Sequence, residues 1–332
     1  MTSLPDDSTL QPPVSAVTGQ NVVIALERAP LDGDARATLE PINPDKSKDD
    51  IFKVSAGLAK ELEIRAARRD ELLGYLASCA SVESWTLGSN KNIVAEQTRN
   101  VARLLPQNAR VLDVGFGVGF SSLEFGRQGY SVTGVEPSIV NIEIASRAAE
   151  KFGIKFRGVH ATAEVMGKFG SGAFDAVYFN SSLHHCDDPY AALLNAYALL
   201  DKGGVVILIE PTLKPWRSKA WFFRQLETNP IGMAHYGGNE HIYYNWEYAR
   251  MLRRAGFKEI TFSSIFAETD LRSYIIAKVQ RKTDGKFTHG LMAISARAGY
   301  YAMMEKMSKR QIFNAFYKWL SLGDGLWIAK RV

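Results

Sequence analysis

Short apolar strands alternate with helical stretches through the middle of the chain, and this alternation limits the possible folds more than any other feature. Strands are expected at residues 110–114, 131–135, 155–159, 174–179, 205–209 and 257–265. Helical patterns follow at 121–128, 139–151, 190–200 and 241–255, and a closing strand is expected at 325–330. Such alternation indicates a mostly parallel sheet with helices on both faces. We therefore predict an α/β fold built on one seven-stranded sheet.

The remaining residues divide into an arm, a helical segment and a tail. Residues 1–45 are rich in Pro, Asp, Ser and Thr, which predicts a flexible arm with at most a short strand at 21–26. Helical spacing of leucines through 50–80, and a second helix at 92–105, predict a helical lid over 46–105. Residues 106–265 hold the sheet domain. Residues 266–332 are expected to form helices near 271–279, 288–304 and 308–320 before the closing strand, with a strand at 273–279 as an alternative to the first helix.

Composition excludes several classes of protein. Hydrophobic residues make up 46% of the 332, which excludes a disordered or collagen-like chain. Two cysteines, Cys79 and Cys186, exclude a disulfide-rich secreted scaffold and indicate a reducing compartment. No apolar run approaches the ~18 residues that cross a bilayer, so we expect a cytoplasmic protein.

Positive charge is concentrated in the tail. Residues 271–332 hold 12 of the 40 Lys and Arg residues but only 3 of the 35 Asp and Glu residues. A basic amphipathic helix can lie on an anionic membrane surface. Packing of the same helices on the body, or on a second subunit in a homodimer, is the favoured alternative. Nothing in the chain resembles a module that reads RNA or DNA, so no nucleic-acid partner is expected.

A glycine-rich turn follows the strand at 110–114 and is the most informative motif. It reads Asp-Val-Gly-Phe-Gly-Val-Gly over residues 113–119. Gly115 and Gly117 allow a tight turn and a close approach of the backbone to a ligand. Glu136 ends the next strand, where a carboxylate can accept both hydroxyls of a ribose. The turn and the acid together predict a cofactor that contains adenosine.

Two residues distinguish between adenosine cofactors. Phe120 stands where a dinucleotide fingerprint requires its third glycine. Asp113 would repel a pyrophosphate but attract a cationic amino group. S-adenosylmethionine carries an ammonium group, a sulfonium and a ribose, so it fits both observations. An NAD(P)-dependent oxidoreductase remains the alternative, supported only by the glycine turn and Glu136.

These motifs carry a family resemblance. The segment 113–119 resembles motif I of the class I S-adenosylmethionine-dependent methyltransferases, and Glu136 matches their ribose-binding acid. The segments 174–177 and 183–189 resemble the region around strand four in the ubiquinone-biosynthesis-like branch. The segment 199–204 resembles the turn before strand five. The resemblance covers about residues 90–265 and implies a Rossmann-like, S-adenosylmethionine-binding domain over 106–265.

The resemblance also implies roles for individual residues. Cofactor contacts are implied for Asp113, Gly115, Gly117, Glu136, Pro137, Thr162, Ala163 and Asn180. The first three would border the methionine moiety and Glu136 would hold the ribose. Pro137 and Ala163 would lie beside the adenine, and Asn180 would line the pocket. Thr162 stands where this branch usually has an aspartate, which weakens the expected contact with the adenine amine.

The segment His184-His185-Cys186-Asp187-Asp188 has the composition of a metal site but not the spacing. Adjacent residues cannot all point at one ion, so no metal is expected. A turn is favoured, with one aspartate capping the helix that Pro189 opens. His185 occupies the histidine position of the family motif, where it either has a structural role, which is favoured, or takes a proton from the substrate as general base.

A methyl transfer to a hydroxyl needs a base, and three histidines are candidates. They are His184, His185 and His241, the last in a polar-aromatic cluster that runs from 236 to 246. We therefore expect an enzyme that methylates the hydroxyl of a small molecule, with a catalytically silent methyltransferase-fold binding protein as a further alternative. The aromatic residues Trp216, Trp221, Phe222 and Phe223 are expected in the core or pocket wall, with the core favoured.

Overall fold

A computed structural model of the protein describes residues 55–87, 92–169, 172–228, 239–264 and 325–332. The arm at 1–45 with its strand at 21–26, and the tail helices between 271 and 320, lie outside these residues. Four helices come first: α2 (Ala56–Ala67), α3 (Arg69–Ser78), α4 (Val82–Leu87) and α5 (Asn92–Ala102). The next elements are β1 (Arg110–Val114), α6 (Phe120–Arg127), β2 (Ser131–Glu136), α7 (Ile139–Phe152) and β3 (Phe156–His160).

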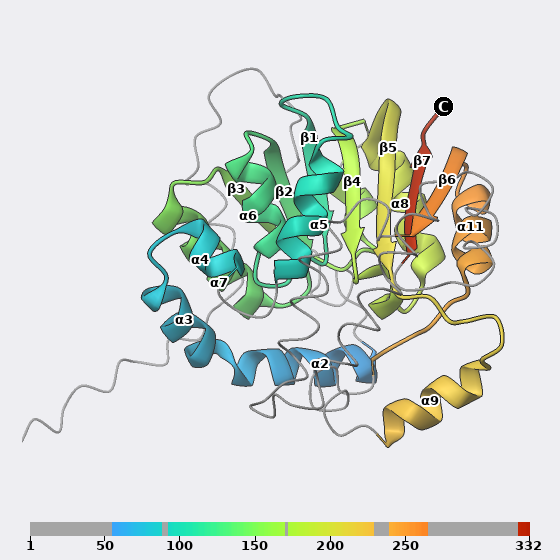
Figure 1. The fold of residues 1–332 in the computed structure, drawn as a ribbon, viewed down its shortest axis with the longest axis horizontal. Coiled ribbons are helices and arrows are strands. Elements are labelled where there is room, and N and C mark those ends of the chain that lie inside the picture. Colours follow the sequence, from blue (N-terminus) through green and yellow to red (C-terminus); the bar gives the residue numbers. More distant parts are fainter. Residues whose placement is uncertain (1–54, 88–91, 170–171, 229–238, 265–324) are drawn as a thin grey trace, which may run out of the picture.

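The second half of the described chain completes the sheet (Figure 1). It contains η2 (Met166–Phe169), β4 (Phe174–Asn180), η3 (Leu183–His185), α8 (Pro189–Leu199) and β5 (Leu200–Glu210). It ends with α9 (Lys219–Glu227), α11 (Asn245–Arg254), β6 (Lys258–Ser264) and β7 (Gly325–Lys330). The labels η2 and η3 denote 3₁₀ turns.

The predicted seven-stranded sheet is confirmed. Its strand order is β3-β2-β1-β4-β5-β7-β6. The pairs from β3 to β5 are parallel, whereas β7 runs antiparallel between β5 and β6. The direction of winding reverses between β1 and β4, so the loops that leave these two strands separate there and open a crevice. Strand β7, the predicted closing strand, lies inside the sheet between β5 and β6.

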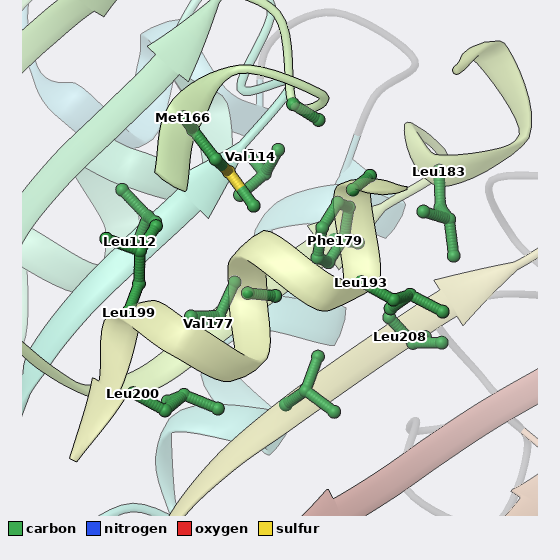
Figure 2. Close-up of a cluster of buried hydrophobic side chains, with 14 of the residues drawn as sticks. Leu112, Val114, Met166, Val177, Phe179, Leu183, Leu193, Leu199, Leu200 and Leu208 are labelled. Carbon is green, nitrogen blue, oxygen red and sulfur yellow. The ribbon is translucent and has the colours of Figure 1, made fainter. Parts of the chain in front are cut away.

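Alternating residues of the strands face two hydrophobic layers. Val177 and Leu208 point to the face covered by α8, η2 and α11, and Figure 2 shows part of this cluster. Val111 and Tyr178 point to the opposite face, which α5 and Phe125 of α6 cover. A period of two along each strand therefore fills both layers. At ~25 cal/mol per Å² of apolar area, this burial on both faces is the main stabilising contribution to the fold.

Three details differ from the sequence predictions. Strand β5 begins at Leu200, five residues before the predicted start, with a register shift against β4. Helix α11 begins at Asn245, because the backbone from residue 241 forms a bridge and a loop before Glu247 caps the helix. The aromatic residues near α9 are not in the core: Trp216 is 55% exposed and Phe223 is 39% exposed. Helix α9 has no buried residue, because it projects beyond the sheet layers (Figure 1).

Candidate active site

The glycine turn packs tightly against the end of β4. Gly115 has φ +70°, and a Cβ there would lie 2.5 Å from the Cβ of Ser182. Gly117 has φ +58°, and a Cβ there would meet nothing within 4 Å. Both backbone conformations favour glycine over any L side chain. The turn is therefore closed on the β4 side at Gly115 and open to space at Gly117.

Asp113 lies beneath this turn at the end of β1. Its side chain is 1% exposed, and its Oδ2 accepts hydrogen bonds from the hydroxyls of Ser121 at 2.5 Å and Ser122 at 2.7 Å. Burial raises the pKa of Asp113 to about 6, although the two serine hydrogen bonds work in the opposite direction. Asp113 lines neither of the two cavities described below, so its expected place beside the methionine moiety stays a prediction.

Glu136 at the end of β2 holds the turn from the other side. Its Oε2 accepts the Gly117 amide at 2.9 Å, and its Oε1 accepts the Ser138 amide and the Asn141 side chain, each at 3.1 Å. A carboxylate offers about four acceptor positions, so these three bonds leave one for a ligand. Burial raises the pKa of Glu136, against the charge of Arg65 and the bond from Gly117.

Two adjoining cavities lie at the ends of β1, β2 and β4. The first, of about 100 Å³, is lined by Glu136, Pro137, Thr162, Ala163 and His185 together with the glycine turn and helix α2. The second, of about 190 Å³, lies between the glycine turn, Asn180, α2 and α3. Both cavities are lined by Gly115, Gly117 and Arg65. The Arg65 side chain therefore stands where one ligand could span both spaces.

The predicted cofactor residues other than Asp113 all line these cavities. Asn180 also donates to Tyr178 Oη at 2.8 Å and to Gln97 at 3.1 Å, which sets the orientation of its amide. Thr162 is 8% exposed and lies on the wall beside Glu136. The residues present fit S-adenosylmethionine, because Glu136 keeps an acceptor position for ribose and Gly117 faces open space.

His184 is buried in η3 between two carboxylates. Its Nδ1 lies 2.6 Å from Oε2 of Glu210, and its Nε2 lies 3.5 Å from Oε2 of Glu240. Burial opposes a charged ring, but Glu210 and then Glu240 outweigh it and raise the pKa of His184 to about 10. Glu210 also accepts the backbone amides of Ser182 and Leu183 at 3.1 and 2.8 Å. A histidine already protonated at neutral pH cannot accept a proton, so the expectation that His184 is a base is not supported.

His185 is the candidate base that lines a cavity. Its Nδ1 donates to the backbone carbonyl of Asn239 at 2.7 Å, so Nε2 is the nitrogen that can accept. Burial, followed by the charge of His184, lowers the pKa of His185. Glu61 of α2 is a neighbour of His185. Its carboxylate lies 3.7 Å from His185 Nδ1 and accepts a hydrogen bond from the side-chain amide of Asn239 at 2.9 Å.

His241 is placed differently from the other two histidines. Its backbone amide donates to the His184 carbonyl at 3.0 Å, and it lines neither of the two cavities. The structure thus brings His184 and His185 together, with ring centroids 4.2 Å apart, and His241 joins them through its backbone amide.

Several residues of the site had no signal in the sequence. Arg65 and Arg68 lie on a charged helix and look like ordinary surface residues until α2 is placed over the crevice. Glu240 and Asn239 lie in the polar-aromatic segment 236–246, which the sequence marked as a cluster without giving either residue a role, because their position depends on β5 and α11. Ser121 could have been found, because it follows the glycine turn by two residues and can reach Asp113 from the first turn of α6.

The profile of the methyltransferase domain family matches residues 90–261, which include the glycine turn, Glu136, His185, strands β1 to β5 and the first part of β6. The chain belongs to this family. It is a class I S-adenosylmethionine-dependent methyltransferase, as the residues of the glycine turn implied, and it is similar to the ubiquinone-biosynthesis branch. The expected cofactor is confirmed with the family.

Curated relatives match a shorter region. A ubiquinone biosynthesis O-methyltransferase of Psychrobacter cryohalolentis is 32% identical over 120 residues, which cover 36% of this chain and 47% of the relative. The enzyme of the same name from Caulobacter sp. strain K31 is 36% identical over 110 residues, which cover 32% of this chain and 44% of the relative. The chain therefore spans about half the length of the curated relatives that it matches.

A solved structure shows the same fold. It is the geranyl diphosphate C-methyltransferase of Streptomyces coelicolor A3(2), in complex with Mg²⁺, geranyl diphosphate and S-adenosyl-L-homocysteine. The two chains are 19% identical with a TM-score of 0.51, over 80% of this chain and 98% of the other. Among the residues that our structure describes, no helix is long and apolar enough to cross a bilayer.

Proposed function

We propose that this methyltransferase acts on a hydroxyl group of a small-molecule acceptor. One observation carries the proposal: Glu136 and His185 line the same cavity, although 49 positions of sequence numbering separate them. A ribose-binding acid and a candidate proton acceptor therefore face one space. The curated relatives named O-methyltransferases support the same reaction.

The chain's own residues would hold the cofactor along the glycine turn. Glu136 would accept one ribose hydroxyl in the smaller cavity, beside Pro137 and Ala163 for the adenine. The larger cavity, which Arg65 and Arg68 line, would take the methionine end. The two guanidinium groups pair with Glu61 and Glu71 in the structure and would bind the carboxylate of the cofactor. The charge of Asp113 beneath the turn would favour the ammonium group.

The protein's contribution to the reaction is orientation, exclusion of water and removal of one proton. Bound S-adenosylmethionine supplies an electrophilic methyl group on a sulfonium. Helix α2 covers the crevice with Leu58, Glu61 and Arg65, which limits the access of water. The acceptor hydroxyl must lose its proton as it attacks, and the cluster around His185 is the place on the cavity wall where that can happen.

The proposal is tested first by calorimetry and then by transfer of a labelled methyl group. Purified full-length protein is titrated with S-adenosylmethionine, S-adenosylhomocysteine and NADH. We expect binding of the first two and none of NADH. Binding of NADH alone would support the oxidoreductase alternative instead.

Transfer is then measured on panels of phenol, alcohol, amine and activated-carbon acceptors. Labelled product in the hydroxyl panels supports O-methylation, and product only in the amine or carbon panels contradicts it. Cofactor binding without transfer to any panel would favour the catalytically silent binding protein.

A further inference from the structure

Three side chains from two segments converge on one point beside the cavity. They are His184 and His185 of η3 and Glu240 of the loop before α11, and each offers a ligand atom within 4.8 Å of the other two. The Nε2 atoms of His184 and His185 lie 3.5 and 4.0 Å from the carboxylate oxygens of Glu240. We infer that these three side chains form a binding site for one divalent metal ion of the zinc class.

The hydrogen bonds behind the two rings carry this inference. In protein metal sites, a ligating histidine almost always donates its other ring N–H to a carboxylate or a backbone carbonyl. His184 meets the first condition through Glu210 at 2.6 Å, and His185 meets the second through the Asn239 carbonyl at 2.7 Å. Both bonds use Nδ1, so both Nε2 atoms are turned toward Glu240.

The charge around the rings favours a cation. Glu210 is fully buried, and Glu61 and Glu240 are largely buried, so three carboxylates lie around the two imidazoles. A divalent ion offsets this negative charge, and buried charges are stable only when they are paired or coordinate a metal.

The three ligands would have to draw together around an ion. Ligand atoms about 2.1 Å from a tetrahedral zinc ion lie about 3.4 Å from one another. The Nε2 atom of His184 lies 3.5 Å from Oε2 of Glu240, that of His185 lies 4.0 Å from Oε1, and the three ligand atoms lie within 4.8 Å of one another. Catalytic zinc sites use three protein ligands and keep a fourth, open position for water or substrate, and His185 is the ligand here that lines the cavity. Two imidazole ligands favour zinc, cobalt or iron over magnesium, which prefers oxygen ligands.

The sequence argument against a metal fails for an identifiable reason. Successive residues of a regular strand point to opposite faces, but η3 is a 3₁₀ turn. Glu210 and Asn239 then pull the Nδ1 sides of both rings to one side, which leaves the ring centroids 4.2 Å apart. The third ligand comes from position 240, outside the motif altogether.

The ion would have a role in the reaction of the proposed function, on which this part of the inference rests. An acceptor hydroxyl bound at the open position would have a lowered pKa and would release its proton to water, because the Nε2 atom of His185 would then be a metal ligand and could not accept it. Its oxygen would then form the O–CH₃ bond as the S–CH₃ bond breaks, and the sulfonium would become a thioether. No redox step is involved.

The test measures metal binding by itself. Full-length protein is treated with a chelator, dialysed and titrated with Zn²⁺, with Co²⁺ for its visible absorption, and with Mg²⁺. We expect one Zn²⁺ or Co²⁺ per chain and at least ~10-fold weaker binding of Mg²⁺. Glu240→Gln and His184→Ala should each weaken Zn²⁺ binding at least ~100-fold, since a lost direct ligand costs no less than a lost orienting partner.

Two controls separate the site from the fold. Glu247 lies seven positions after Glu240, and its carboxylate caps α11 and pairs with Lys219. Glu247→Gln removes that carboxylate and should leave Zn²⁺ affinity unchanged. S-adenosylhomocysteine binding and a thermal melt check that each variant is folded. Glu240→Gln keeps the size and shape of the side chain, so it is the milder variant if His184→Ala unfolds.

Two outcomes overturn the inference. One is the absence of stoichiometric Zn²⁺ or Co²⁺ binding by folded protein that binds S-adenosylhomocysteine. The other is binding that Glu240→Gln leaves unchanged. Methyl transfer to a hydroxyl that persists in chelator would remove the catalytic role and leave the proposed function intact. Stoichiometric metal binding without transfer to a hydroxyl would contradict the proposed function and leave the metal site in place.

Discussion

The cofactor side and the acceptor side of the crevice are built in different ways. At the ends of β1 and β2, Glu136 is held by partners at most 19 positions away, from Gly117 to Asn141. At the ends of β4 and β5, His184 is held by a carboxylate 26 positions away and His185 by a carbonyl 54 positions away. The first arrangement is nearly local to one strand–turn–helix unit, whereas the second depends on the packing of separate elements.

The difference explains why one side could be interpreted from motifs and the other could not. A glycine turn and an acid at the end of the next strand have the same relation in every sheet of this type. The relation of η3 to Asn239 depends on where the loop between β5 and α11 returns to the sheet. We therefore expect substitutions on the two sides to separate cofactor binding from turnover.

The largest expected effect is on the acceptor side. His185→Ala should lower kcat at saturating cofactor by at least ~100-fold, because His185 is the histidine of the cluster that lines the cavity. The affinity for S-adenosylhomocysteine should change much less, which steady-state kinetics and calorimetry on the same preparation would show. Glu143→Gln, in a surface ion pair on α7, is the control. A kcat within twofold of the unsubstituted enzyme would remove His185 from the mechanism.

The matching change on the cofactor side is Glu136→Gln. It should weaken S-adenosylhomocysteine binding by about 10- to 100-fold, since it replaces a charge-assisted hydrogen bond to the ribose with a neutral one. At saturating cofactor, kcat should change far less than in His185→Ala. Calorimetry measures the first effect and saturation kinetics the second. Unaltered affinity would place the ribose elsewhere.

Asp113 gives the cofactor side a pH dependence. The pKa of Asp113 is raised to about 6, so the carboxylate is charged at pH 7 and mostly protonated at pH 5. If its charge attracts the cofactor's ammonium group, affinity for S-adenosylhomocysteine should fall about tenfold between pH 7 and pH 5. Asp113→Asn should bind weakly at both pH values, with a flatter profile. A profile as steep in Asp113→Asn would assign the dependence to another group.

The smallest effect is expected at the exposed insertion after β5. Trp216→Ser should change the free energy of unfolding by no more than about 0.5 kcal/mol, because Trp216 is 55% exposed. Trp327→Ala, in the fully buried centre of β7, should cost about 3–5 kcal/mol. Urea unfolding of both variants makes the comparison. A large loss in Trp216→Ser would show that the α9 segment supports the body of the fold.

Much of the sheet was predictable because its strands have strong patterns of their own. The predicted ends of β1 and β7 agree with the structure, since glycines or a polar residue bound each apolar run. The start of α11 and the exposure of Trp216 were not predictable, because each depends on how the insertion after β5 packs. The roles of Glu240 and Arg65 in the site also depend on tertiary packing, so the sequence did not identify them as site residues.

The sequence by itself determined the alternating fold, the glycine turn and the acid that faces it. These features follow from periodicity, from the conformational freedom of glycine and from the fixed relation between neighbouring parallel strands. Only the tertiary structure decided which helix of the predicted lid lines the crevice, and that His184, His185 and Glu240 meet at one point. The physical reason is that their positions depend on hydrogen bonds between segments far apart in the chain, which no local pattern records.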